Sequence, residues 1–293
     1  MRKTKLYMDT VVDIQVVTGK SNQAAAEKIN QAFQAFYQVE QACSRFSPSS
    51  ELMRACQNVG TPVEISPFFF EPLHFAIEMA RMTEGLFDPT VGKVMEKNGF
   101  NRHYLTGDRM DSPAADSVSY QDIVMDRQPR TLLLKKPLVI DLGAVAKGFA
   151  IDLAAQELKE FDGFLINAGG DLFAGGLDFY GQPWKIGIQH PFQKDQLIDT
   201  VEITNQAICT SGSYERRNPA IADLHHIVNP KTKQSPNQWV SVSVMAPFAM
   251  MADAFSTSSF LLGGEKGKQL IEDANLQGIW ITPELQLVRT GGI

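Results

Sequence analysis

Residues 141–152 bring together groups that can hold a phosphate. The segment reads DLGAVAKGFAID and stands between the apolar run 137–140 and the helix-forming stretch 153–160, which predicts a strand, a glycine-containing turn and a helix. Such a turn exposes unpaired N–H groups at the positive end of the helix dipole, and Lys147 adds a full charge. Asp141 adds a carboxylate that can accept hydrogen bonds from a heterocycle or bind a cation. On these residues alone, the segment is either an anion site or a plain structural junction.

A second group of candidate residues lies on a helix that we expect to begin at Pro247 and to end at Gly263. Asp253 and Thr257 are four residues apart, hence on one helical face, and their neighbours are small enough to allow close approach. Carboxylate, hydroxyl and backbone carbonyl oxygens are the ligands that Mg²⁺ or Ca²⁺ select. The helix therefore indicates a hard-cation site, with capping of a local turn by Asp253 as the structural alternative.

The chain also contains two adjacent histidines and two glycine-rich segments that could carry chemistry. His225 and His226 stand where we expect a strand to run into an Asn-Pro turn, so one of them must point inward. An inward histidine can serve as a general base or simply be hydrogen-bonded, and the lack of an HExxH spacing argues against zinc. The glycines of 167–176 and 261–269 have the spacing of neither a dinucleotide fingerprint nor a P-loop.

The overall composition excludes several classes of function. A formal net charge of −6 argues against a general nucleic-acid surface, which needs clustered Lys and Arg. Three unevenly spaced cysteines indicate neither a disulfide framework nor a Cys-based zinc site. Asp9 and Asp13 interrupt the apolar start, and no apolar run approaches the ~20 residues of a membrane span, so we expect no targeting segment and no span. We expect a cytoplasmic protein; an exported lipoprotein that has lost its signal segment is the alternative.

The hydrophobic pattern predicts many short strands and a few long helices, which is typical of an α+β fold. Strands are predicted at 10–17, 131–140, 164–168, 184–189, 199–204, 206–210, 240–246, 279–282 and 285–289. Helices are predicted over 21–42, from Ser50, over 66–85, from Asp88, and over 153–160, 247–263 and 265–275. The aromatic residues expected in the core are Phe33, Phe36, Tyr37, Phe68, Phe69 and Phe70. Residues 101–130 are polar and turn-rich, which predicts a surface excursion, and without a visible linker or repeat we expect one domain over 1–293.

Eight short segments occur in a fixed order along the chain. They are MDTVVDIQV, SRFSPSSEL, GLFDPTVG, DLGAVAKGFAID, NAGGDL, TSGSYERR, HIVNP and ADAFST. In this order they resemble the motifs of the ApbE family, the Mg²⁺-dependent FAD:protein FMN transferases, over nearly the whole chain. The departures are Asp9 where the family has Gly, Lys233 for the Gly of PxTG, Asn229 for Asp, and the missing lipoprotein signal. We expect Asp9 and Asn229 to affect local turns more than the chemistry.

The resemblance implies a fold and a set of site residues. The fold would be of the ApbE type, related to T-folds, with mostly antiparallel sheets covered by helices. Mg²⁺ would be held by the Ala144 carbonyl, Asp253 and Thr257, with Ser256 as a further candidate. FAD would lie across the same junction and contact Met8, Phe46, Leu86, Phe87, Asp88, Asp141, Lys147, Tyr214 and Ile227. Of these, Phe46 and Tyr214 would supply apolar or stacking contact with the rings.

The activity implied by the resemblance is a phosphoryl-type transfer. A Ser or Thr hydroxyl of an acceptor flavoprotein would attack the FMN-side phosphorus of FAD, and AMP would leave. Mg²⁺ and Lys147 would stabilise the developing charge, and His226 is the candidate base. Water in place of the hydroxyl would make the protein an FAD pyrophosphatase, and a non-catalytic flavin carrier is the alternative of another class.

Overall fold

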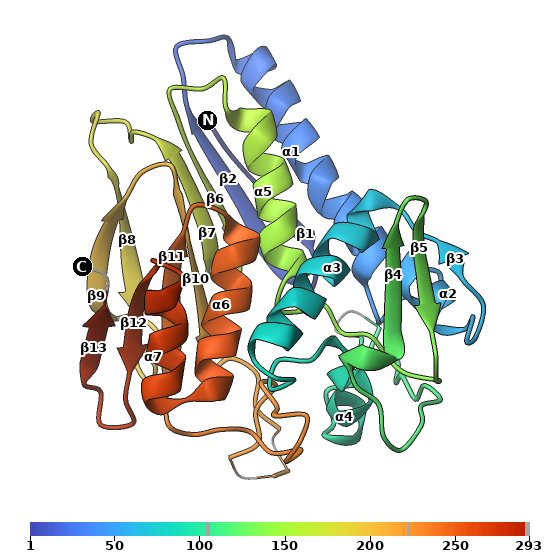
Figure 1. Ribbon diagram of the computed structural model, residues 1–293. Helices are drawn as coiled ribbons and strands as arrows, with labels where there is room; N and C mark the ends of the chain where they lie inside the picture. The colour runs from blue at the N-terminus through green and yellow to red at the C-terminus, as the bar shows by residue number, and fades with distance from the viewer. Residues whose placement is uncertain (104–105, 219, 222, 291–293) are drawn as a thin grey trace.

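The centre of the molecule is an eight-stranded antiparallel sheet, in a computed structural model that describes residues 1–103, 106–218, 220–221 and 223–290 (Figure 1). Its strands, in spatial order, are β1 (Arg2–Tyr7), β2 (Thr10–Val17), β6 (Gly163–Ala168), β7 (Asp171–Gly176), β10 (Gln206–Gly212), β11 (Ser241–Ala246), β12 (Gln277–Ile281) and β13 (Leu287–Thr290). The sequence pattern did not predict β1 or β7. The predicted α+β class with antiparallel sheets is confirmed.

One face of this sheet is covered by helices. They are α1 (Asn22–Cys43), α5 (Ala146–Leu158), α6 (Ala249–Leu262) and α7 (Gly264–Asp273). The Ser21 hydroxyl caps α1 by accepting the Ala24 N–H at 3.3 Å, as the sequence predicts. Phe33 and Phe36 are buried, but Tyr37 is 45 % exposed, so its predicted core position is wrong. One residue step turns a helix by about 100°, which carries Tyr37 off the buried stripe.

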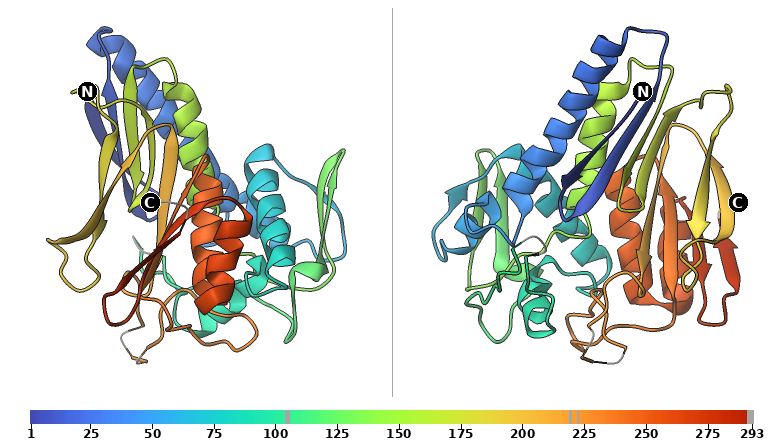
Figure 2. Two further views of the ribbon diagram at one scale, coloured as in Figure 1. Left: turned by 60° about the vertical axis from the view of Figure 1, so that its left-hand side comes forward. Right: turned by 180° about the vertical axis from the view of Figure 1, so that it is seen from behind.

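The opposite face carries a two-stranded hairpin of β8 (Trp184–Gln189) and β9 (Leu197–Ile203) (Figure 2). Alternate residues of β8 are buried and form a second apolar cluster with β7, β10, β11 and β12. The Trp184 indole N–H donates to the Gly175 carbonyl at 3.2 Å, which satisfies its buried polar atom. The central sheet is therefore covered on both faces at its β10–β12 end.

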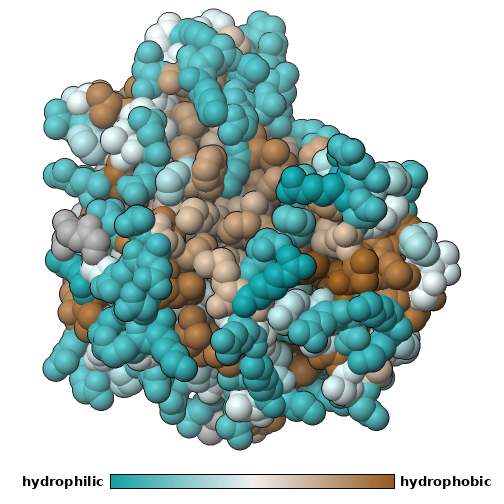
Figure 3. All heavy atoms as spheres, in the orientation of Figure 1, coloured by the Kyte–Doolittle hydropathy of each residue, from teal (hydrophilic) through white to brown (hydrophobic). Residues whose placement is uncertain are grey.

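A side lobe lies beside the sheet. It contains α2 (Glu51–Cys56), α3 (Pro67–Met82), η1 (Pro89–Val91), α4 (Gly92–Lys97), η2 (Tyr120–Asp122) and a small sheet of β3 (Val63–Glu64), β5 (Arg130–Leu134) and β4 (Ile123–Arg127). Figure 3 shows apolar side chains gathered over this lobe. Phe69 and Phe70 are buried as predicted, whereas Phe68 is only partly buried.

Two predictions about the lobe's strands are wrong. Residues 101–130 are not wholly an excursion, because Ile123–Arg127 pair with β5. The strand predicted at 131–140 ends at Leu134, and the buried run 137–140 is irregular because Pro137 has no N–H to donate to a sheet.

Among the described residues, no helix combines the length and the apolar character that crossing a membrane requires.

Candidate functional site

A pocket of about 720 Å³ opens where the helices of the main sheet meet the side lobe. Its walls come from segments that are far apart in the sequence: the β1–β2 turn, the end of α1, residues 86–91, residues 141–147, the end of β10, residues 226–228 and α6. This volume lies in the range of small-molecule and cofactor sites. Of the residues proposed from the sequence, the structure places these in the lining: Met8, Phe46, Leu86, Phe87, Asp88, Asp141, Ala144, Lys147, His226, Ile227, Asp253 and Thr257.

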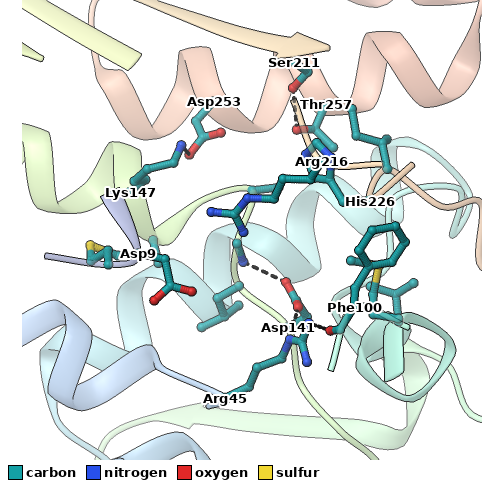
Figure 4. Close-up of a pocket in the computed structure, with 18 of the residues that line it drawn as sticks. Asp9, Arg45, Phe100, Asp141, Lys147, Ser211, Arg216, His226, Asp253 and Thr257 are labelled. Atoms are coloured by element: carbon teal, nitrogen blue, oxygen red, sulfur yellow. Dashed lines mark hydrogen bonds and ion pairs between the residues drawn. The ribbon is translucent and has the colours of Figure 1, made fainter. Parts of the chain in front are cut away.

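Lys147 and Asp253 meet because α5 and α6 cross closely at Gly148. A Cβ atom on Gly148 would lie 2.4 Å from the Ala249 carbonyl oxygen, so a larger residue would push the helices apart. The Lys147 Nζ lies 3.8 Å from the Asp253 Oδ2, and the Gly148 N–H donates to the same oxygen at 3.3 Å. Figure 4 shows the lysine and the carboxylate converging on one wall of the pocket. One glycine thus joins the two segments that the sequence singled out.

The cation of Lys147 is shared with a second carboxylate, Asp171. Asp171 is buried, pairs with Lys147 and accepts the Thr210 N–H at 3.2 Å. The Asp253 carboxyl is also buried, and burial raises its pKa while Lys147 lowers it. One lysine therefore balances two buried carboxylates.

Hydroxyl groups line α6 next to Asp253. The Ser211 hydroxyl lies 2.8 Å from the Thr257 hydroxyl and 2.9 Å from the Ser256 hydroxyl. The Ser256 hydroxyl donates to the Asp253 carbonyl at 2.9 Å, and Ser256 does not line the pocket. We therefore remove Ser256 from the candidate ligands, because its side chain points from α6 towards β10 rather than into the cavity.

An arginine that sequence reasoning missed holds the opposite wall. Arg45 is 6 % exposed, and it donates to the Asp141 carboxylate at 2.5 Å and to the Phe100 carbonyl at 2.6 Å (Figure 4). Its guanidinium also lies 4.1 Å from the centre of the Phe46 ring. Asp141 is thereby fixed in place, since it also accepts the Gly143 N–H at 2.8 Å.

The Asp88 carboxylate organises its own loop. It accepts the backbone N–H and the hydroxyl of Thr90, each at 2.8 Å, and the Tyr120 N–H at 3.0 Å. Burial raises the pKa of Asp88. These bonds make Asp88 the cap of η1 and place the neighbouring Leu86 and Phe87 at the pocket, so its contribution is to position the loop.

Tyr214 does not reach the pocket, contrary to the stacking role expected for it. Its ring packs with the second apolar cluster under the β8–β9 hairpin, and burial raises its pKa to about 12. Tyr214 follows the end of β10, where the chain can turn to either side of the sheet, and it takes the side away from the helices. Phe46 is therefore the aromatic candidate that remains in the lining.

His226 and His225 lie on an irregular segment rather than on the predicted strand, with one isolated bridge between Arg217 and His225. His225 is buried and its Nε2 lies 2.9 Å from the Pro236 carbonyl. His226 lines the pocket, and its buried Nδ1 has no hydrogen-bond partner among the described residues. Burial, aided by the nearby positive charge of Arg216, lowers the pKa of His226 to about 3. The ring is therefore neutral at physiological pH.

The donor set at α6 fits Mg²⁺. The Asp253 carboxylate, the Thr257 hydroxyl and Ala144 all line the same pocket, and Mg²⁺ accepts such oxygens while keeping waters or substrate phosphates as its other ligands. Within the described ranges, no group of three His, Cys, Asp or Glu residues could hold a metal alone. A cation here would thus depend on one carboxylate and on what the ligand brings.

The ApbE family model matches residues 8–280. The chain belongs to the ApbE family. The FAD:protein FMN transferase of Haemophilus influenzae is 30 % identical over 289 residues, covering 92 % of this chain and 82 % of its own. That of Salmonella typhimurium is 30 % identical over 263 residues, covering 85 % and 72 %. The resemblance predicted from the eight segments is confirmed.

Solved structures agree with this ApbE assignment. The ApbE protein of Thermotoga maritima superposes with a TM-score of 0.86 at 26 % identity, over 99 % of this chain and 96 % of its own. The flavinyl transferase ApbE of Pseudomonas stutzeri gives a TM-score of 0.83 at 22 % identity, over 99 % and 93 %, which supports the fold alone. The predicted ApbE-type fold is therefore confirmed.

Proposed function

We propose that this chain is a Mg²⁺-dependent FAD:protein FMN transferase, which attaches FMN from FAD through a phosphoester to a Ser or Thr of an acceptor flavoprotein and releases AMP. The observation that carries the proposal is the convergence of Lys147, Asp253 and Thr257 on one pocket that also has an apolar wall. The names of the Haemophilus influenzae and Salmonella typhimurium relatives support the same reaction.

The pocket offers separate surfaces for the two kinds of group in FAD. Phe46, Leu86, Phe87 and Ile227 supply apolar contact for a ring system. The cationic groups Lys147 and Arg216 face the same space and suit a pyrophosphate (Figure 4). The Arg216 side chain is exposed, lines the pocket and makes no hydrogen bond or ion pair with a described residue, so its donors are available to a ligand.

Mg²⁺ would be held by Asp253, Thr257 and the Ala144 carbonyl, and it would supply charge stabilisation to a phosphoryl oxygen. Lys147 holds its positive charge between Asp171 and Asp253, at the wall where the pyrophosphate would lie. Because Arg45 and Asp141 fix the opposite wall, the ligand would be oriented between two rigid surfaces.

His226 is the proposed base for the acceptor hydroxyl. Its ring is neutral and carries a buried nitrogen with no partner among the described residues, so it can take a proton. Arg216 contributes to the low pKa of His226. A bound pyrophosphate that neutralises Arg216 would raise that pKa and make the imidazole a stronger base.

The test is incubation of the protein with FAD, Mg²⁺ and an acceptor domain that carries its Ser/Thr motif. Flavin fluorescence that stays with the acceptor after denaturation, and that disappears when the acceptor hydroxyl is replaced by Ala, is the expected result. AMP and free FMN formed at the same rate with and without the acceptor would instead establish an FAD pyrophosphatase. Tight FAD binding without any AMP release would establish a flavin carrier.

A further inference from the structure

The β1–β2 turn is a two-residue hairpin loop with an unusual backbone. Tyr7 pairs with Thr10, and between them Met8 and Asp9 have φ of 52° and 62°. Two successive positive φ angles are typical of type I′ hairpin turns, where Asn, Asp and Gly are favoured and a long side chain such as that of Met8 is strained. The Met8 N–H donates to a Glu40 carboxylate oxygen of α1 at 2.7 Å, which holds the turn against the helix.

This turn presents the Asp9 carboxylate to the pocket. Asp9 belongs to the lining, and Figure 4 shows its carboxylate pointing into the cavity, across from Arg216. From the sequence we expected that Asp at this position, where the family has Gly, would affect the local turn more than the chemistry. The structure adds a negative side chain to a wall that a glycine would leave bare.

Asp9 differs from the other buried or half-buried carboxylates of the pocket in having no hydrogen-bond or ion-pair partner among the described residues. Glu40, Asp88, Asp141, Asp171 and Asp253 each accept a hydrogen bond from a neighbouring residue. Asp9 makes no hydrogen bond or ion pair with any residue that the structure describes, and of the pocket acids only the exposed Glu215 shares this property. Asp9 is thus a half-buried acceptor that lacks a donor.

The charges around Asp9 and the chemistry of its carboxylate limit which ligand groups could donate a hydrogen bond to it. Burial raises the pKa of Asp9, while the charges of Arg216, His103 and Arg45 lower it. An ionised carboxylate accepts hydrogen bonds and donates none. A ligand group that hydrogen-bonds to Asp9 must therefore carry an O–H or N–H. Phosphates offer neither when ionised, whereas the sugar hydroxyls, the adenine amine and the flavin imide of a flavin dinucleotide all do.

We propose that Asp9 is a substrate-contacting residue that the family's usual glycine cannot provide, and that its carboxylate accepts a hydrogen bond from an O–H or N–H group of the bound dinucleotide. The role of Asp9 rests on the proposed binding of FAD. It adds a negative recognition point opposite the phosphate-facing cations Lys147 and Arg216. The donor lies either in the adenosine half of FAD or in the flavin half.

The experiment compares Asp9→Gly and Asp9→Asn with the wild-type protein by calorimetric titration of FAD, ADP and FMN in the presence of Mg²⁺. Gly and Asn both tolerate the left-handed turn, so the fold should be kept. Asp223→Gly is the matched control, because Asp223 also has positive φ, 61°, but is exposed and lies outside the pocket.

Asp9→Gly is expected to weaken FAD binding about tenfold, the loss of one charge-assisted hydrogen bond, and Asp9→Asn about threefold because a neutral acceptor oxygen remains. A parallel loss for ADP alone assigns the donor to the adenosine half, and a loss for FMN alone assigns it to the flavin half. FAD affinity of Asp9→Gly that stays within twofold of wild type, or increases, overturns the proposal. Failure of the wild-type protein itself to bind FAD would instead overturn the proposed function.

Discussion

The Lys147 Nζ and the Asp253 Oδ2 come from different helices and lie 3.8 Å apart in the pocket wall. Asp171 engages the same lysine from β7. The three residues therefore tie α5, α6 and the central sheet together through charge, at the place where the proposed substrate is most negative. Changes to this group should alter both stability and turnover.

Lys147→Met should lower the free energy of unfolding by about 2 to 3 kcal/mol, because it leaves buried Asp171 without its cation. The expected loss of stability is smaller than that for breaking a fully buried ion pair, because the Lys147 side chain is 24 % exposed. Urea titration measures the loss. The double variant Lys147→Met/Asp171→Asn should recover most of it; a double variant as unstable as the single one would show that packing, not charge, causes the loss.

Asp253→Asn should reduce Mg²⁺-dependent turnover on the order of 100-fold while the fold survives. The amide keeps an oxygen for the Gly148 N–H but removes the charge that would hold the cation. Thr257→Val, which removes one neutral ligand, should cost on the order of tenfold. Rates measured across a Mg²⁺ titration test both expectations, and near-normal turnover of Asp253→Asn at low Mg²⁺ would place the metal elsewhere.

Asp152 should make stability fall as the pH rises from about 4 to 6. Burial raises the pKa of its carboxyl from 3.8 to about 6, although it caps α6 by accepting the Ala249 and Met250 N–H groups at 2.6 and 2.9 Å. Between these pH values the folded state binds more protons than the unfolded state, so deprotonation favours unfolding.

Asp152→Asn removes this titration and keeps one acceptor oxygen. The stability of wild type relative to this variant should therefore decline between pH 4 and 6. Thermal melts across that range give the comparison. A difference that is independent of pH would mean that Asp152 titrates normally in the folded protein.

His226→Gln should lose transfer by about 10² to 10⁴-fold while binding FAD within about threefold of wild type. Since the pKa of His226 lies at about 3 in the free protein, its ring stays neutral from pH 5 to 9. The titration of His226 should therefore cause no change of kcat/KM for FAD near pH 6.5. Rates and calorimetry separate the two effects. Undiminished transfer by the variant would assign the base to another group.

Phe46→Ala should weaken FAD binding about tenfold, whereas Tyr214→Phe should leave it unchanged. The Phe46 ring lines the pocket, but the Tyr214 ring packs in the second apolar cluster on the other side of the sheet. Fluorescence titration with FAD tests the pair. A loss of affinity in Tyr214→Phe would show that the Tyr214 hydroxyl contacts FAD, and unchanged affinity in Phe46→Ala would remove Phe46 from the binding residues.

The contiguous motifs explain why Lys147, Asp253 and Thr257 could be found from the sequence. Asp253 and Thr257 sit on a helix that Pro247 signals, and helix geometry places them on one face. Lys147 was found from the glycine-containing turn, although α5 begins at Ala146, before the predicted helix 153–160. The pairing of Arg45 with Asp141 joins residues 96 positions apart, and no local pattern encodes that contact. The same holds for Asp171, which reaches Lys147 only because β7 lies under α5.

Strand predictions failed where a paired strand has exposed side chains or where a buried segment is not paired in a sheet. β4 carries mostly exposed side chains, so residues 123–127 lack the alternation that marks a strand. Residues 138–140 are fully buried but have no sheet partner, and an apolar run looks the same in either case. The sequence does not determine on which side of the sheet the Tyr214 ring lies. That side depends on which apolar cluster packs at the end of β10.

The walls of the pocket begin at Met8 and end at Leu261, and α5 packs against both α1 and α6. The cavity therefore forms only after contacts between distant parts of the chain have closed, and such non-local topologies fold slowly. Neither half of the chain could keep the cavity alone. Because only the folded chain has this cavity, a ligand seated there would stabilise the whole fold, and FAD should raise the melting temperature by an amount set by its concentration relative to its Kd.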